Sequence, residues 1–170
     1  MSVGCEMVRL TDGRNVTIRP LGADDGAALI AAVEREDPGD LRRRFMGAPP
    51  PAVNLARRIG RADGFHDLVL GAFAGDGRLV GVAQFDRADE GPGAEVAIEV
   101  AHDWQRARLG TVMLTRLAQL ARDRGVHEFT ASYYADNVAI RRLLAHLGRL
   151  RTGGYDHGTG YARIDLDETA

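Results

Sequence analysis

The stretch AEVAIEVAHDWQRARLGT, residues 94–111, constrains the fold of this chain more than any other. Apolar residues alternate with the rest between Glu95 and Val100, which is the period of a strand with two unlike faces. From Leu109 onward they return at helical spacing, after a short polar turn at 103–108. A turn that leads into a helix presents N–H groups without helical partners, and the helix dipole favours anions there. The stretch therefore predicts a strand, an anion-binding turn suited to phosphate, and a helix.

The rest of the chain divides into further elements at its Gly, Pro and Asp residues. Strands are expected over 7–10, 15–19, 68–74, 78–86, 127–133, 149–155 and 161–166, helices over 23–35, 40–45, 52–59, 109–124 and 137–147, and a loop over 89–93. The turns at 11–14 and 75–77 indicate antiparallel hairpins because their Gly residues tolerate positive φ. The strand at 95–101, the helix and the strand at 127–133 predict a βαβ unit with parallel strands.

Composition excludes several classes of function. A length of 170 residues suits one domain, and a net charge of −2 gives no reason to expect nucleic acid or an anionic membrane as the main partner. Cys5 is the only cysteine, so an internal disulfide or a thiolate metal cage is impossible, and the scattered His residues predict no metal site. No apolar run approaches the roughly 20 residues of a membrane span, and the N-terminus lacks the layout of a secretion signal. We expect a cytoplasmic protein.

The polar turn carries the first candidate site. Arg106 and Arg108 place two permanent cations beside the exposed N–H groups, with Gln105 preceding them, and Gly110 allows a ligand to approach the backbone closely. A dinucleotide-binding fold is disfavoured because the GxGxxG pattern is absent. A βαβ connection that binds nothing remains the alternative, since many such turns have no ligand.

Five segments together resemble a known family: DGRNVTIRP, LRRRFMG, AEVAIEVAHDWQ, QRARLGT and DNVAIRRLLAHLG. They are similar to the GCN5-related N-acetyltransferases (GNAT family), over about residues 15–166. The resemblance implies one N-acetyltransferase domain, residues 1–170, that uses acetyl-CoA as cosubstrate and no metal. It also implies an α/β (α+β) fold, with a mixed, mostly antiparallel sheet of six to seven strands flanked by helices. The central strand pair should splay apart to admit the pantetheine arm.

The resemblance implies a coenzyme site. Its expected residues are Ile98 and Val100 on the strand, the turn and helix start Gln105, Arg106, Ala107, Arg108, Leu109, Gly110 and Thr111, and Asn137. The strand backbone should orient the thioester, the amides of the turn should hold the pyrophosphate, and Asn137 should lie beside the pantetheine arm. A helix cap is the alternative role of Asn137, and both roles are compatible.

Two positions depart from the family pattern. Arg108 stands where the first Gly of the Q/R-x-x-G-x-G/A turn is usual, so it should tighten phosphate binding if its backbone angles are ordinary and distort the turn if positive φ is required. Leu144 stands where many relatives carry a Tyr that protonates the departing thiolate. The chain has four tyrosines that are candidates for that role, although none of them matches the motif by spacing. They are Tyr133, Tyr134, Tyr155 and Tyr161.

The reaction needs a group that receives a proton, because an amine attacks a thioester only when neutral and a lysine has a reference pKa of about 10.4. Glu95 and Glu99 are the nearest carboxylates, and their shared strand parity predicts one face for both. The resemblance favours Glu95 as the catalytic base, since it matches the A-E-h-h motif of the protein-lysine branch. Each carboxylate has a structural alternative, either exposure to solvent or pairing with an arginine, and for Glu99 the alternative is the preferred interpretation.

Within the family, the sequence looks most like bacterial protein lysine acetyltransferases that modify acyl-CoA synthetases. We therefore expect direct transfer of an acetyl group to a primary amine on a protein lysine, by a monomer or homodimer. A small-molecule amine N-acetyltransferase and a non-catalytic acyl-CoA-binding sensor are the alternatives, the latter motivated by Leu144 and Arg108. The cations Arg42, Arg43 and Arg44 could favour an acidic acceptor. Their alternative is a solvated helix face with one Arg paired to a carboxylate.

Overall fold

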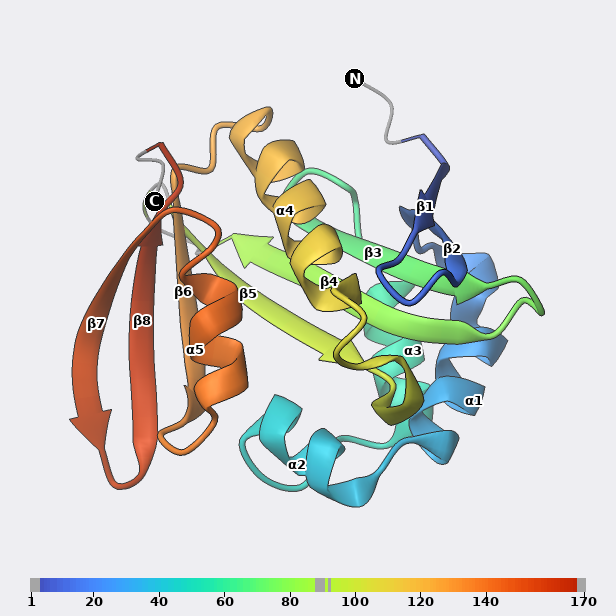
Figure 1. The fold of residues 1–170 in the computed structure, drawn as a ribbon, viewed down its shortest axis with the longest axis horizontal. Coiled ribbons are helices and arrows are strands. Elements are labelled where there is room, and N and C mark those ends of the chain that lie inside the picture. The colour runs from blue at the N-terminus through green and yellow to red at the C-terminus, as the bar shows by residue number, and fades with distance from the viewer. Residues whose placement is uncertain (1–3, 88–90, 92, 168–170) are drawn as a thin grey trace.

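The computed structural model describes residues 4–87, 91 and 93–167, and it places eight strands in one sheet (Figure 1). The strands are β1 (Glu6–Arg9), β2 (Asn15–Pro20), β3 (Asp67–Ala74), β4 (Leu79–Arg87), β5 (Gly93–Val100), β6 (Glu128–Tyr134), β7 (Arg149–Asp156) and β8 (Thr159–Asp165). Their order across the sheet is β1-β2-β3-β4-β5-β6-β8-β7. The helices are η1 (Ala23–Asp25), α1 (Gly26–Arg35), α2 (Pro38–Phe45), α3 (Ala52–Ile59), η2 (His102–Trp104), α4 (Leu109–Arg122) and α5 (Val138–Leu144).

The centre of the sheet is splayed, as expected. Neighbouring strands pair antiparallel except β5 and β6, which are joined through α4 and pair in parallel. Their pairing ends at Glu95 and Thr130, although β5 continues to Val100 and β6 to Tyr134. Beyond that point the two strands diverge (Figure 1). The predicted βαβ unit and the mixed, mostly antiparallel sheet are thus both confirmed.

Two hydrophobic clusters hold helices against opposite faces of the sheet (Figure 1). The larger cluster packs α4 and α5 on one face, and fully buried side chains of α4 such as Met113 and Leu117 lie at its centre. The smaller packs α1 and α3 on the other face around Leu29 and Ile59. Alternation along β5 directs Val96 to the larger cluster, so its odd-numbered residues face the side of α1 and α2.

The fold differs from the sequence expectations in detail. The sheet has eight strands instead of six to seven, because both arms of the first and last hairpins join it. The helix predicted over 137–147 ends at Leu144, where hydrogen bonds such as Leu147 N–H to Leu144 O tighten the chain into turns. Most of the loop predicted over 89–93 lies outside the described residues. Within the described part of the chain, no helix has the length and apolar character needed to cross a membrane.

Candidate functional site

In the turn before α4, every second residue has a left-handed backbone conformation. Arg106 and Arg108 have φ of 61° and 66°, in the left-handed region, and both side chains are exposed. Ala107 and Leu109 between and after them are buried in the larger cluster. A left-handed residue with a Cβ costs roughly 1–2 kcal/mol. Glycine at position 108 would therefore relieve strain. Arg108 replaces the usual glycine at a position where the backbone has positive φ.

The first hairpin supports this turn from one side. The Arg14 guanidinium lies 3.9 Å from the centroid of the Trp104 ring, and its Nη1 donates to the Asp103 carbonyl at 3.0 Å. The Thr11 N–H also reaches the Ala107 carbonyl at 3.5 Å. Sequence reasoning missed Arg14 because no local pattern indicates that a hairpin residue nearly ninety positions away packs on the turn.

The second support comes from Gln105 and α2. Gln105 Nε2 donates to the Val100 carbonyl and to Asp40 Oδ2, each at 3.1 Å. The side chain of Gln105 is thereby committed to holding the turn against β5 and the start of α2. The N–H groups of Leu109, Gly110 and Thr111 begin α4 and have no carbonyl partner within that helix. The turn offers these amides, with two exposed guanidinium groups nearby, to an anion.

Gly110 has a packing role as well. A Cβ at this position would lie 3.3 Å from Leu143 Cδ1 of α5 and 3.6 Å from Ile98 Cδ1 of β5. The glycine therefore lets α4, α5 and β5 meet tightly beside the splay. Close approach by a ligand at Gly110 stays a prediction.

Asn137 caps α5, as its alternative role required. Its Oδ1 accepts a hydrogen bond from the Ile140 N–H at 3.2 Å. Leu144 of the same helix is fully buried in the larger cluster. Tyr133 packs against Gly160 of β8, since a Cβ there would lie 2.7 Å from Tyr133 Cε2, so its ring lies on the side of β6 away from β5. Burial raises the pKa of Tyr133, with Tyr155 adding to the effect.

Glu95 lies at the fork of the splayed strands. It pairs with Thr130 of β6 in the last position of the parallel ladder, and with Asp86 of β4 on its other side. Its side chain is exposed. The carboxylate is therefore accessible at the point where β5 and β6 part.

Glu99, four residues further along the same face, is paired with an arginine. Its Oε2 lies 3.2 Å from Nε of Arg44 on α2, and their side chains are only 15% and 4% exposed. Arg44 also donates from Nη2 to Gln84 Oε1 at 3.0 Å. Burial raises the pKa of Glu99 while Arg44 opposes that rise, and burial lowers the pKa of Arg44. The alternative role of Glu99, pairing with an arginine, is thus confirmed, as is that of the Arg triplet, in which one Arg pairs with a carboxylate. Of the three arginines, only Arg42 and Arg43 are exposed.

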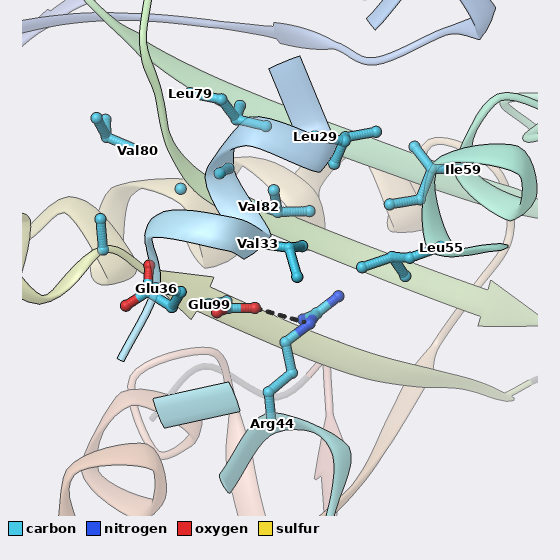
Figure 2. A pocket seen from close by; sticks show the side chains of 13 residues that line it. Leu29, Val33, Glu36, Arg44, Leu55, Ile59, Leu79, Val80, Val82 and Glu99 are labelled. Carbon is cyan, nitrogen blue, oxygen red and sulfur yellow. Dashed lines mark ion pairs between the residues drawn. The ribbon is translucent and has the colours of Figure 1, made fainter. Parts of the chain in front are cut away.

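A cavity of about 30 Å³ adjoins this ion pair between α1, α2, α3 and the sheet (Figure 2). Its walls combine apolar residues, among them Val33, Leu55 and Val82, with the polar groups of Glu36, Arg44 and Glu99. Burial, followed by repulsion from Glu99, raises the pKa of Glu36 to about 7. Sequence reasoning missed Glu36, which follows α1 as its C-terminal capping residue and belongs to no motif.

A larger open groove of about 640 Å³ lies next to the cavity. It carries charges of both signs, from Arg35, Asp37, Arg78 and Asp103, together with Glu36. Among the residues that the structure describes, no three His, Cys, Asp or Glu side chains are grouped to hold a metal ion.

Comparison with known proteins gives one consistent result. The family model of the acetyltransferase (GNAT) domain matches residues 15–149. Acetyltransferase PA5475 of Pseudomonas aeruginosa is 29% identical over 143 residues, covering 82% of this chain and 77% of that protein. The GNAT domain of S. lividans PAT has a TM-score of 0.85 at 24% identity, covering 95% of this chain and 97% of that one. The structure of yncA from Salmonella typhimurium with acetyl-CoA has a TM-score of 0.67 at 23% identity, covering 91% and 96%.

Proposed function

Because the chain belongs to the GNAT acetyltransferase family, we propose that it is an N-acetyltransferase that moves the acetyl group of acetyl-CoA directly to a primary amine. The observation that carries this proposal is the fork between β5 and β6, with Glu95 at its base and the anion-ready turn at the start of α4. Residues 1–170 would act as one N-acetyltransferase domain, in the cytoplasm.

The turn and α4 would hold the coenzyme. The free amides of Leu109, Gly110 and Thr111 suit a pyrophosphate, since the start of a helix favours anions. Arg106 and Arg108 would add positive charge, while Ile98 and Val100 would present strand backbone to the thioester where β6 has parted from β5. Asn137 caps the start of α5 through its Oδ1 and would contact the pantetheine arm through its side-chain NH2 group.

Glu95 would act as the base. A protonated amine first loses a proton, through water, to the Glu95 carboxylate, and the neutral nitrogen then attacks the thioester carbon. The new N–C bond forms, the C–S bond breaks, and the sulfur leaves as thiolate and takes a proton to become the free thiol. The exposure of Glu95 beside the fork suits this role, whereas Glu99 is committed to Arg44.

For the acceptor we propose a protein lysine, such as one on an acyl-CoA synthetase. The open groove beside α1 and η2 supports a peptide-sized acceptor, because it carries Arg35 and Arg78 as well as Asp37 and Asp103. Mixed charges of this kind match a polar protein surface better than a uniformly acidic or basic one. A small-molecule amine would use the same coenzyme residues, so the acceptor must be identified by experiment.

The test is a screen with labelled acetyl-CoA over amines and proteins, including an acyl-CoA synthetase from the same cell, comparing the wild type with Glu95→Gln. We expect the variant to lose at least about 100-fold in kcat, the lower range for a positioned base, with coenzyme affinity unchanged. Glu128→Gln, which removes a carboxylate of β6, serves as the matched control. A Glu95→Gln variant with the wild-type rate would remove Glu95 as the base while leaving acetyl transfer intact.

A further inference from the structure

The strands β6, β8 and β7 are covered on one face and open on the other. The larger hydrophobic cluster, which includes α4 and α5, takes alternate residues of these strands, such as Phe129 and Ile164 (Figure 1). The residues between them point to the other face, where Ser132 is exposed and Tyr161 is 44% exposed. This open face continues onto the side of β5 on which Glu95 lies.

The strand register places Glu95 and two arginines in one row across this face. Glu95 of β5 pairs with Thr130 of β6, which pairs with Arg163 of β8. Arg163 in turn pairs with Arg151 of β7, the strand at the edge of the sheet. Neighbouring strands lie about 4.8 Å apart, so the backbones of Arg163 and Arg151 lie about 10 Å and about 14 Å from that of Glu95.

The positive charge of Arg163 and Arg151 is poorly compensated. Like charges directly opposite each other in a sheet are destabilising. Glu128 and Asp165 occupy the neighbouring row, but Glu128 Oε1 comes only within 3.8 Å of Arg163 Nη1, and 68% of the Arg163 side chain is exposed. Arg151 is exposed, and its side chain has no ion pair or hydrogen bond with any residue that the structure describes. A carboxylate bound between the two arginines would relieve their repulsion.

The cations on this face are guanidinium groups and not amines. All 22 basic side chains of the sequence are arginines, and the sequence contains no lysine. A guanidinium is always charged, so it does not attack a thioester as a neutral amine does, and its planar fork suits a carboxylate. Arg163 and Arg151 can therefore hold an acidic group near Glu95 without competing for the acetyl group.

We propose that Arg163 and Arg151 select acceptor proteins that carry an acidic side chain about three or four residues from the lysine to be acetylated. This proposal rests on the acetyl transfer proposed above. With the lysine amine at Glu95, the row presents positive charge about 10–14 Å away. An extended peptide covers that distance in about three to four residues, at roughly 3.3–3.6 Å each. A glutamate or aspartate at that spacing reaches the two arginines.

This surface is separate from the open groove. The groove meets the chain at Ala101, beyond the end of β5, whereas Glu95 lies near the start of β5. The distance along the strand is about 20 Å, at roughly 3.3 Å per residue. A protein interface of ordinary size takes about 20–30 residues from each side, so a protein acceptor can contact both surfaces with its lysine between them. A small amine cannot.

The experiment uses peptides with a blocked N-terminus and a single lysine, flanked on both sides at the third residue by Glu, Gln or Arg. We expect the wild type to prefer the Glu peptide over the Gln peptide about fivefold in kcat/KM, the upper range for an exposed ion pair. Arg163→Glu should reverse the order and prefer the Arg peptide, and Arg151→Glu, at the sheet edge, should do the same. Arg9→Glu reverses an exposed charge at the opposite edge of the sheet and should keep the wild-type order.

A change of peptide preference separates recognition from a general loss of structure, because damage to the fold lowers the rate with all three peptides equally. Equal kcat/KM for the three peptides in the wild type, or an unchanged order in both Arg163→Glu and Arg151→Glu, would overturn the proposal. Acetylation of small amines but of no peptide would overturn it as well, and acetyl transfer itself would stand in each of these cases. If the wild type acetylates no small amine, peptide or protein, the proposed function fails and the role of the two arginines fails with it.

Discussion

Two substitutions of Arg108 separate the effect of its strained backbone on stability from the effect of its positive charge on coenzyme binding. Its φ of 66° costs about 1–2 kcal/mol with a Cβ present, and glycine removes that cost but gains roughly 0.5–1 kcal/mol of chain entropy in the unfolded state. Arg108→Gly should therefore be more stable than the wild type by about 0.5–1 kcal/mol, or up to about 4 °C in Tm for a chain of this length. Arg108→Ala keeps the Cβ and the strain, so its stability should match the wild type within about 0.5 kcal/mol.

Coenzyme binding should instead weaken equally in the two variants. Both variants lose the same cation, which in water is worth about 1 kcal/mol at 4 Å from a phosphate and thus about fivefold in Kd. Urea unfolding measures the first effect, and calorimetric titration with acetyl-CoA measures the second. Equal stability of the Gly and Ala variants would refute the strain, and an unchanged Kd in both would remove Arg108 from the phosphate site.

Further substitutions test the other contacts. Arg44→Met should destabilise the protein by about 3 kcal/mol in urea unfolding, because it leaves Glu99 buried without its partner, and adding Glu99→Gln should recover most of the loss. The pKa of Glu36 is raised to about 7 from 4.5, so the folded state binds the proton more tightly and the free energy of unfolding falls as pH rises from 4.5 to 7. Near pH 8, Glu36→Gln should therefore be more stable than the wild type by about 1–2 kcal/mol, a value reduced for the partial exposure of Glu36. The difference in unfolding free energy, measured with urea, should disappear below pH 4.5. Arg14→Ala removes the contact with Trp104 and should raise the coenzyme Kd about fivefold while leaving the amine KM unchanged; an equal rise in both would contradict a role confined to the turn.

Local pattern was sufficient for most of the secondary structure. The hydrophobic stripe of α4 and the alternation in β5 extend over enough residues to fix both the type of element and the face it buries. The hairpin turns at Gly13 and Gly77 adopt the positive φ that their sequences predicted. The splay of β5 from β6 has no such local signal and was expected only through the family resemblance.

The contact of Arg44 with Glu99, and the place of Glu36 beside them, could not be predicted from the sequence, for a geometric reason. Three consecutive helical residues project about 100° apart, so only one of Arg42, Arg43 and Arg44 can face the sheet, and the packing of α2 decides which one. Glu36 comes near Glu99 only because the residue that follows α1 and the end of β5 line the same cavity. Likewise, the left-handed angle of Arg108 follows from the burial of Ala107 and Leu109 on either side of it.

The most direct test of the central claim follows both products of one reaction. Purified protein, labelled acetyl-CoA and an acyl-CoA synthetase or other lysine-bearing acceptor are incubated together, and free CoA thiol and labelled amide are measured over time. Acetyl transfer at this fork predicts one thiol released for each acetyl group recovered as an amide. Tight binding of acetyl-CoA with neither product, across a broad panel of proteins and small amines, would contradict it and indicate a coenzyme-binding module without catalytic activity.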